Sequence, residues 1–425
     1  MGYGEFLLTG ARVFSGGRFQ TADVAVSAGK IVSRPPASFD PKVIPLGGML
    51  LLPGFADVHV HFREPGFSYK ETVATGSAAA AAGGYSDVFT MPNLNPVPDA
   101  LENLRPQLDA IDLSATVNVH PFGAITKGEK GEELSDMAAL APFVAGFSDD
   151  GHGVQDGALM RDAMTAAKAL DKPIVAHCEV NSLLVRGGCV HDGEWARAHG
   201  FTGISSASEW KMVERDLDLV RDAKCQYHVC HVSTRESIEL VRDAKKEGLP
   251  VSCETGPHYL VMSDADLRDE GRFKMNPPIR SAADRDALLE GLADGTVDCI
   301  ATDHAPHSAE EKARGLAGSA FGVVGLETAF AVLYTRLVKT GVIALETLVD
   351  RLAIRPHHLF GLKACAFADG DRADLTAVAT GNRGKIDPIQ FLSKGKATPF
   401  EGWEVDAEIA LAMCGGNISY VKGKL

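Results

Sequence analysis

Two histidines separated by one residue stand where an apolar run of the chain ends. The run 54–60, GFADVHV, leads into His61, Arg63 and Glu64. If the run is a strand, His59 and His61 lie on one face with Cα atoms about 7 Å apart, so that both rings reach one ion. Taken alone, this spacing does not separate a metal site from ordinary buried histidines.

Other apolar runs end in the same kind of side chain. His177 follows the run PIVA, His231 ends YHVCH, and Asp303 follows CIAT. In a parallel barrel the carboxyl ends of the strands meet on one rim, where active sites form. Four histidines and one carboxylate on that rim predict a metal centre. Imidazole with carboxylate suits Zn²⁺, with Mn²⁺ or Co²⁺ as replacements.

The apolar run that ends at Phe147 continues as Ser148, Asp149, Asp150 and Gly151. This segment offers no lysine, so a bridging carbamylated lysine from this strand is excluded. If two ions bind, one of the two aspartates is the natural bridge, and spacing alone does not choose between them. A turn or a helix cap is the alternative interpretation of the segment.

Several polar residues near the same rim are candidates for binding a substrate. Arg63 lies two residues beyond His61, and its guanidinium there would grip a carboxylate through two hydrogen bonds. Asn93, Asn276 and His307 also follow predicted strands, although asparagine favours turns as well. His120 and His152 are rim candidates that nothing further supports. The alternation of a strand places His228 opposite His231, and Cys178 and Cys230 are expected to be packing groups.

These residues need a scaffold of alternating strands and helices. Apolar runs alternate with longer segments of helical period, the last of them about 326–339, which implies βαβ units and a parallel sheet. Eight such units predict a closed (β/α)8 barrel over residues 51–361, with a doubly wound open sheet as the alternative. The predicted strands are 54–60, 86–91, 116–121, 143–147, 173–178, 226–232, 250–255 and 298–304.

The two ends of the chain have a different pattern, with short strands and turns. Residues 1–50 and 362–425 are predicted to form one small β-sandwich domain that the barrel splits in the sequence. The composition gives a formal net charge of -14 and no block of Lys or Arg, which argues against a nucleic acid or an anionic membrane as partner. Eight scattered cysteines without a C-x-x-C pair indicate reduced thiols in a cytoplasmic protein.

Seven motifs taken together, in this order along the chain, carry a family resemblance: HVHFREPG, MPNLNP, FSDDG, VAHCE, CHVST, KMNPPIR and ATDHAPH. The chain resembles the amidohydrolase superfamily, and within it the bacterial dihydroorotase family that lacks the carbamylated lysine. The resemblance covers essentially the whole chain. Leu94 and Tyr259 depart from the usual pattern, in which threonine and histidine stand at these positions.

The resemblance implies a distorted barrel with an attached β-sandwich and a centre of two zinc ions, bridged by Asp150 and a hydroxide. It implies that His59, His61 and Asp303 bind the first ion, and that His177 and His231 bind the second. Asp303 would also be the catalytic acid and base. The implied substrate-binding residues are Arg63, Asn93 and His307 for a carboxylate, and Asn276, Phe321 and Gly322 for a pyrimidine ring.

The implied reaction is the reversible closure of N-carbamoyl-L-aspartate to (S)-dihydroorotate in pyrimidine biosynthesis. The alternatives are another cyclic amide hydrolase, of the allantoinase or dihydropyrimidinase type, and an inactive scaffold for aspartate carbamoyltransferase. A homodimer, and an association with aspartate carbamoyltransferase, are further expectations from the family.

Overall fold

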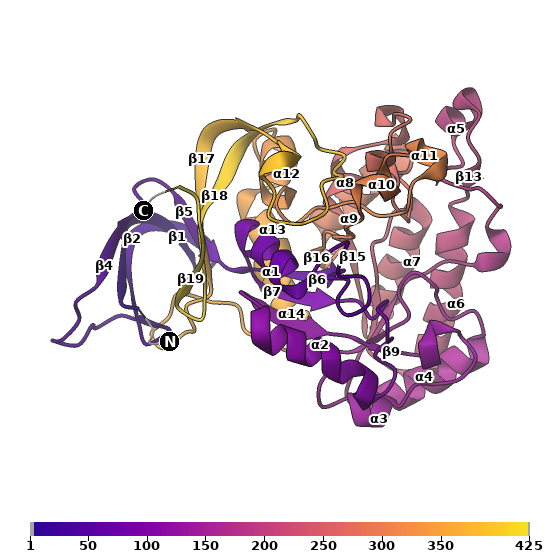
Figure 1. Cartoon of the computed structure of the whole chain (residues 1–425), viewed down its shortest axis with the longest axis horizontal. Helices are drawn as coiled ribbons and strands as arrows, with labels where there is room; N and C mark the ends of the chain where they lie inside the picture. The colour runs from indigo at the N-terminus through magenta and orange to yellow at the C-terminus, as the bar shows by residue number, and fades with distance from the viewer. Residues whose placement is uncertain (1–3, 424–425) are drawn as a thin grey trace.

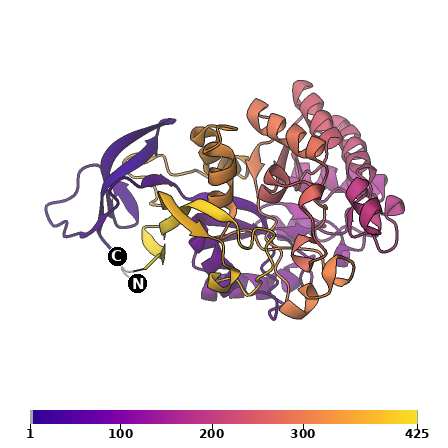
Figure 2. The same cartoon turned by 90° about the horizontal axis from the view of Figure 1, so that it is seen from above.

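An eight-stranded sheet lies beside a body of parallel strands and helices in the computed structural model, which describes residues 4–423 (Figures 1 and 2). Strands from both ends of the chain form this sheet: β1 (Phe6–Ser15), β2 (Arg18–Ser27), β3 (Lys30–Val32), β4 (Lys42–Pro45), β5 (Leu50–Pro53), β17 (Leu375–Lys385), β18 (Glu404–Cys414) and β19 (Asn417–Val421). Their order is β19-β18-β17-β5-β1-β2-β3, and β4 pairs with β1. The two ends of the chain join where β17 runs antiparallel to β5.

The sheet has an apolar core of its own and also contacts the body. Leu8, Val26 and Ile44 are fully buried in a cluster that belongs to the sheet. Val378 of β17 and Ala407 of β18 instead belong to the main core of the body. The C-terminal strands therefore attach the sheet to the helices beside it, as Figure 1 shows where β17 and β18 pass next to α12 (Ala329–Leu333).

The body contains two parallel sheets. One holds β6 (Phe55–Val60), β7 (Tyr85–Thr90) and β8 (Asn118–Pro121) in that order. The other has the order β16-β15-β14-β11-β10-β9. Its strands are β9 (Gly123–Ala124), β10 (Phe147–Ser148), β11 (Ile174–Ala176), β14 (Tyr227–Val229), β15 (Val251–Thr255) and β16 (Cys299–Ile300).

The two parallel sheets meet at both edges. Only Phe122 separates β8 from β9, and its N–H donates to the carbonyl of Thr90. At the other edge Val60 forms a parallel bridge with His304, just beyond β16. Every predicted apolar run overlaps one of these strands, although several strands are only two or three residues long.

Helices connect successive strands and surround them (Figure 2). Polar caps set where several begin: Thr72, Thr234 and Ser281 each accept a hydrogen bond from the backbone N–H three residues later. The predicted last helix is shorter and less regular than expected, because α12 continues as a π-helical turn over Tyr334–Val338. The other α-helices are α1 (Val73–Ala82), α2 (Leu101–Ser114), α3 (Met137–Leu140), α4 (Gly157–Ala169), α5 (Glu194–His199), α6 (Ala207–Ala223), α7 (Arg235–Lys246), α8 (Pro257–Val261), α9 (Ala282–Asp294), α10 (Ala309–Lys312), α11 (Gly315–Gly318), α13 (Leu345–Val349) and α14 (Arg355–Leu359). A second π-helical turn, Asp350–Ile354, joins α13 to α14.

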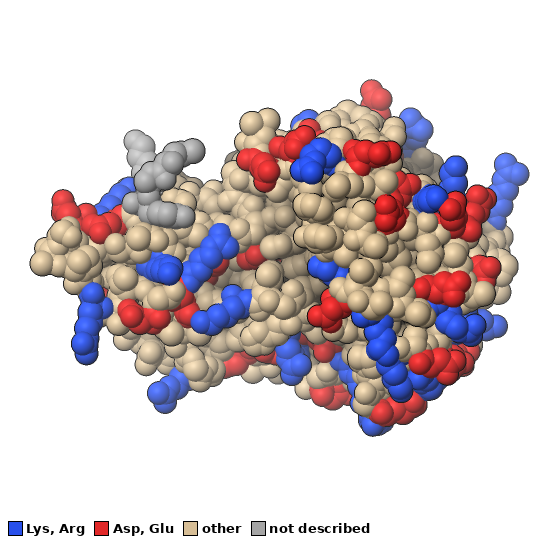
Figure 3. Space-filling model, turned by 90° about the horizontal axis from the view of Figure 1, so that it is seen from below, with Lys and Arg blue, Asp and Glu red and all other residues tan. Residues whose placement is uncertain are grey.

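The surface and the thiols agree with the composition. Basic and acidic side chains are interspersed over the face in Figure 3. All eight cysteines are free; seven are buried and Cys414 is half-buried. Among the helices in residues 4–423, none combines the length and the apolar character that crossing a membrane requires.

Candidate metal centre

The polar residues predicted at the strand ends come together at one cavity of about 240 Å³. His59 lies within β6, and the other candidate metal ligands and Arg63 follow the carboxyl ends of β6, β10, β11, β14 and β16 within three residues. Asn93 follows β7 equally closely, whereas Asn276 and His307 lie farther beyond the preceding strand. The cavity is lined by His61, Arg63, Asn93, Asp150, Gly151, His177, His231, Asn276, Asp303, Ala305, His307, Phe321 and Gly322. Every site residue predicted from the sequence lines it except His59, which is fully buried beneath it.

Asp150 is the carboxylate that the four histidines share. Its Oδ1 atom lies 3.4 Å from His59 Nε2, and 3.7 Å from both His177 Nδ1 and His231 Nε2. Its Oδ2 atom lies 3.5 Å from His61 Nε2. This central position fits a carboxylate that bridges two ions.

Asp149, the other aspartate of the pair, faces away from the histidines. It accepts hydrogen bonds from the backbone N–H groups of Ile125 and Thr126 and from the Thr126 hydroxyl. Burial raises its pKa to about 6, against these hydrogen bonds. Asp149 therefore holds the backbone at Ile125 and Thr126 in place. The spacing of the two aspartates in the sequence did not reveal this difference between Asp149 and Asp150.

Asp303 completes a second group of ligand atoms. Its Oδ1 atom lies 3.1 Å from His61 Nε2 and 3.5 Å from His59 Nε2. Two sets, His59–His61–Asp303 and His59–Asp150–His231, each bring ligand atoms within 4.8 Å of one another. His177 joins the second set, because its Nδ1 atom is 2.9 Å from His231 Nε2.

The charges around these atoms favour a bound cation. Burial lowers the pKa of His59, but the carboxylates of Asp150 and Glu254 outweigh burial and hold that pKa well above its ordinary value. Burial raises the pKa of Asp150, but His59 and the neighbouring rings hold it well below the ordinary value. Among the described residues, His59 Nε2 and Asp150 Oδ1 also have no hydrogen-bond partner. The carboxylates that favour a proton on His59 would equally favour a divalent cation, which an imidazole nitrogen binds after it has lost that proton.

Arg63 brings a positive charge to the same cavity. Its side chain is 9% exposed, and its Nε atom has no partner among residues 4–423. Burial lowers the pKa of the guanidinium, while Asp303 and Asp150 raise it. A buried cation that lacks a hydrogen-bond acceptor is a ready partner for an anionic group.

Asn93 and His307 are already engaged with neighbouring residues. The Asn93 side chain contacts His61 Nδ1 through Oδ1 at 2.9 Å, and its amide group donates to Asp150 Oδ2 at 3.3 Å. His307 Nε2 donates to the carbonyl of Phe321 at 2.6 Å, and its Nδ1 accepts from Lys70 at 3.2 Å. His307 therefore presents no free donor to a carboxylate in this arrangement, whereas Asn93 keeps its second amide hydrogen.

Three further residues of the cavity wall are those predicted to contact a ring. Asn276 donates to Glu179 at 3.1 Å, and its Oδ1 atom has no partner within the described part of the chain. Phe321 is 38% exposed at the rim. Gly322 has a φ of +126°, and a Cβ there would lie 2.7 Å from the Ala305 carbonyl, so that only glycine lets the backbone pass this close.

Other predicted features lie outside the cavity. His120 was a rim candidate, but its Nε2 contacts Asp87 at 2.8 Å and it does not line the cavity. Leu94 is buried, and the Tyr259 hydroxyl donates to the Pro277 carbonyl at 2.5 Å, beside Asn276. The two residues that depart from the family pattern are therefore buried outside the cavity, and neither side chain lines it.

Glu254 and Glu179 contact the candidate ligands, and the sequence prediction missed both. Glu254 Oε1 lies 2.7 Å from His59 Nδ1, and Glu179 Oε2 lies 3.7 Å from His177 Nε2. The only feature of the sequence that could have indicated them was a glutamate within or shortly after an apolar strand. Such a residue is rarely buried unless it is paired.

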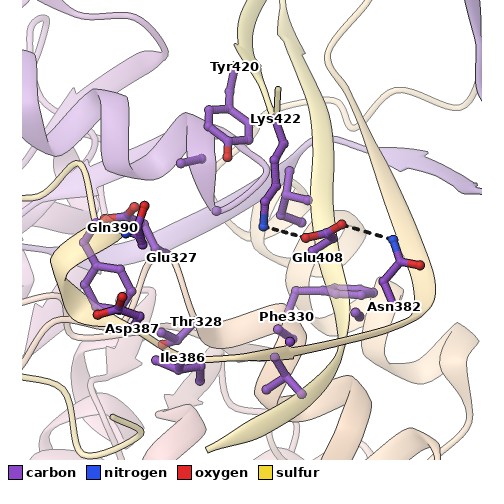
Figure 4. A pocket seen from close by; sticks show the side chains of 18 of the residues that line it. Glu327, Thr328, Phe330, Asn382, Ile386, Asp387, Gln390, Glu408, Tyr420 and Lys422 are labelled. Atoms are coloured by element: carbon purple, nitrogen blue, oxygen red, sulfur yellow. Dashed lines mark hydrogen bonds and ion pairs between the residues drawn. The ribbon is translucent and has the colours of Figure 1, made fainter. Parts of the chain in front are cut away.

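A larger cavity, of about 380 Å³, lies between the C-terminal strands and the body (Figure 4). Three of its polar side chains pair with one another: Lys422 donates to Glu408 at 2.5 Å, and Asn382 donates to the same carboxylate at 3.1 Å. It has no histidine in its wall. The smaller cavity at the strand ends is therefore the candidate site.

Known proteins resemble this chain along nearly its whole length. A family model described as dihydro-orotase-like matches residues 48–237. Relatives named dihydroorotase from Bacillus caldolyticus and Geobacillus kaustophilus are each 48% identical, over 99% of this chain and 100% of the relative. The solved structure of an L-hydantoinase (dihydropyrimidinase) from Arthrobacter aurescens is 25% identical with a TM-score of 0.87, over 100% of this chain and 97% of that chain. With full-length relatives at this identity, the chain belongs to the dihydroorotase family of the amidohydrolases.

Proposed function

We propose that this chain is a zinc-dependent dihydroorotase that interconverts N-carbamoyl-L-aspartate and (S)-dihydroorotate with water. One observation carries the proposal: Asp150 lies among four imidazole rings, and Arg63 lines the same cavity. A carboxylate shared by four imidazoles suits a pair of divalent ions. The nearby guanidinium suits a cyclic amide that carries a carboxylate.

The described side chains fit two ions. His59, His61 and Asp303 would hold one, His177 and His231 would hold the other, and Asp150 would lie between them. Zn²⁺ at this place supplies Lewis acidity, which lowers the pKa of water and polarises the ring carbonyl. The protein supplies the fixed geometry and the dry surroundings.

Asp303 is the group placed to move the proton. Burial raises its pKa, but His59 and His61 outweigh burial and keep it below the ordinary value. Asp303 is therefore a carboxylate at neutral pH, the state that a base requires. In the hydrolytic direction it accepts a proton from the attacking water and donates it to the departing ring nitrogen.

Arg63 fixes which carbonyl faces Asp303, because it binds the carboxylate of the substrate at the other side of the cavity. Asn276 and the backbone at Phe321 and Gly322 contact the ring. To help bind the carboxylate, His307 must exchange a present hydrogen bond for one to the substrate, whereas Asn93 can use its second amide hydrogen. Substrate binding is therefore expected to move His307 more than the candidate metal ligands.

The wider predictions fit this function. We infer that the two parallel sheets, which meet at both edges, form one distorted (β/α)8 barrel over residues 51–361. The β-sandwich domain of residues 1–50 and 362–425, the homodimer, a cytoplasmic location and an association with aspartate carbamoyltransferase stay predictions. An inactive scaffold is disfavoured, because all six candidate metal ligands are present and adjacent.

The likeness to a hydantoinase supports a second candidate, a hydrolase of cyclic amides without a carboxylate. Two assays on one preparation separate the candidates: metal analysis, and ultraviolet-monitored turnover of dihydroorotate, hydantoin, dihydrouracil and allantoin. We expect zinc in the protein and turnover of dihydroorotate. Turnover of hydantoin or allantoin without dihydroorotate would refute the proposal. Protein that binds no zinc and stays inactive after metal is added would instead support the scaffold.

A further inference from the structure

Glu254 is a buried carboxylate that lies behind the metal-ligand histidines. It is fully buried near the end of β15, and it does not line the cavity. Its Oε1 atom lies 2.7 Å from His59 Nδ1 and accepts the backbone N–H of His231 at 3.2 Å. Its Oε2 atom lies 3.2 Å from His228 Nε2, and His228 Nδ1 is 2.7 Å from Ser252 Oγ. One carboxylate therefore contacts two residues that are candidate ligands.

The contact with Glu254 decides which nitrogen of His59 is free. A carboxylate only accepts hydrogen bonds, so the single hydrogen of the neutral His59 ring lies on Nδ1. Nε2 is left with its lone pair, 3.4 Å from Asp150 Oδ1 and 3.5 Å from Asp303 Oδ1. This nitrogen has no hydrogen-bond partner among the described residues. The ring is thus held in the tautomer and the orientation that a metal ligand requires.

Glu254 also holds the backbone that carries His231. His231 has a φ of 32°, in the left-handed region that residues other than glycine rarely adopt. A residue in such a conformation needs support from its surroundings. The hydrogen bond from its N–H to Glu254 supplies part of that support. The same carboxylate therefore positions one residue of each proposed ion site.

We propose that Glu254 is a positioning residue of the metal centre. It sets the tautomer of His59 and supports the backbone conformation of His231. The proposal rests on the proposed function only in requiring that these histidines bind metal. Loss of a partner that orients a metal-bound histidine typically weakens metal binding by about 10- to 100-fold. The Zn²⁺ affinity should fall by this amount when the charge of Glu254 is removed.

The test compares Glu254→Gln with the wild-type chain and with Asp216→Asn. Asp216 is also fully buried and also bonds a β14 side chain, the Tyr227 hydroxyl at 2.6 Å, but it contacts none of the candidate ligands. Zn²⁺ affinity is measured by competition with a chromophoric chelator, and the visible spectrum of Co²⁺-loaded protein reports the ligand geometry. We expect the affinity to fall by about 10- to 100-fold and the Co²⁺ spectrum to change in Glu254→Gln only.

Three outcomes are informative. Equal Zn²⁺ affinity in Glu254→Gln and the wild type overturns the role of Glu254 and leaves the proposed function intact. Equal weakening in Asp216→Asn also overturns it, because any lost buried carboxylate would then have the same effect. A wild-type chain that binds no Zn²⁺ overturns both this inference and the proposed function.

A measurement on the wild type does not depend on how the variant folds. In metal-free protein with ¹⁵N-labelled histidine, at a pH high enough to leave the His59 ring neutral, long-range ¹H–¹⁵N spectra distinguish its two tautomers. The signal that disappears in His59→Gln identifies His59. We expect its hydrogen on Nδ1, and a hydrogen on Nε2 would overturn the proposal.

Discussion

Arg63→Met removes the one guanidinium that lines the candidate site and keeps a long, unbranched side chain. In the metal-free chain we expect little loss of thermal stability. Arg63 is a buried charge whose Nε has no partner within residues 4–423, and burying such a group costs free energy. The lost interaction is with the substrate. A bidentate guanidinium–carboxylate contact has two charge-assisted hydrogen bonds, each contributing about 1.5–3 kcal/mol.

The lower end of that range gives about 3 kcal/mol for the pair, or roughly a 10²-fold effect on binding. The contact is present in both the ground state and the transition state. The KM for dihydroorotate should therefore rise by about 10²-fold while kcat changes less. Arg63→Lys keeps the charge but not the two-pronged geometry, so its KM should lie between those of the wild type and Arg63→Met.

Dihydrouracil provides the matched control, because it has the same ring without the carboxylate. Its inhibition constant should be the same in the wild type and in Arg63→Met, whereas the KM for dihydroorotate rises. Steady-state kinetics with both compounds measure the two effects in one assay. If Arg63→Met weakens dihydrouracil as much as dihydroorotate, the guanidinium does not address the carboxylate and the reasoning is refuted.

Three further predictions follow from the same structure. Asp303→Asn should lower kcat by at least 10²-fold while part of the zinc stays bound, and near-normal turnover beside a normal metal content would contradict its acid–base role. Removing metal with a chelator should lower the melting temperature, and added Zn²⁺ should restore it, because the ions bind only the folded chain; a melting temperature indifferent to metal contradicts this. Glu327 lies in the wall of the larger cavity (Figure 4). Burial raises its pKa from 4.5 to about 7, although its carboxylate accepts hydrogen bonds from the N–H groups of Leu392 and Ser393. The folded state then binds a proton that the unfolded state has lost, so the free energy of unfolding falls as pH rises from 4.5 to about 7. The free energy of unfolding, measured with denaturant at several pH values in this window, should depend less on pH in Glu327→Gln than in the wild type. The same pH dependence in both would mean that Glu327 does not titrate there.

The sequence predicts that the candidate ligands come together because two simple rules place them. Alternation along a strand puts His59 and His61 on one face, and parallel strands present their carboxyl ends on the same side of the sheet. His177, His231 and Asp303 needed only the recognition of an apolar run before each of them. The eight runs were visible because buried parallel strands are continuously apolar.

These two rules do not predict hydrogen bonds between side chains that lie far apart in the sequence. Glu254 meets His59 across 195 positions of sequence, and nothing in the run VSCET shows which side chain its carboxylate will face. The same holds for Lys70, which occupies the Nδ1 atom of His307. The choice between Asp149 and Asp150 also depends on Thr126, which lies in another loop.

The C-terminal segment shows a second limit. Between β17 and β18 the chain leaves the sheet and returns to the body, where Ser393 bonds Glu71 and Lys394 donates to the Ser68 carbonyl. Glu71 is fully buried, and Ser393 is nearly so. The pattern of short strands and turns assigned the whole segment to the small β domain. No local pattern reveals a loop whose polar partners are about 320 positions away in the sequence.

Arg63, His231 and Asp303 share a backbone conformation that explains how strand ends become a site. Their φ angles are 59°, 32° and 46°, and each residue lies two or three positions beyond a parallel strand. A left-handed residue there turns the chain sharply and frees its side chain from the alternation of the strand. Glycine would adopt this conformation without strain, but it has no side chain for the chemistry.

Such a conformation costs about 1–3 kcal/mol at each residue, so it persists only where fixed contacts hold it. The His231 N–H donates to Glu254, and next to Asp303 the His304 carbonyl accepts the N–H of His61 at 2.8 Å. These bonds join neighbouring strands of the body and do not involve substrate. The candidate metal ligands are therefore in position before substrate binds, and we expect the adjustment to fall on loop side chains such as His307.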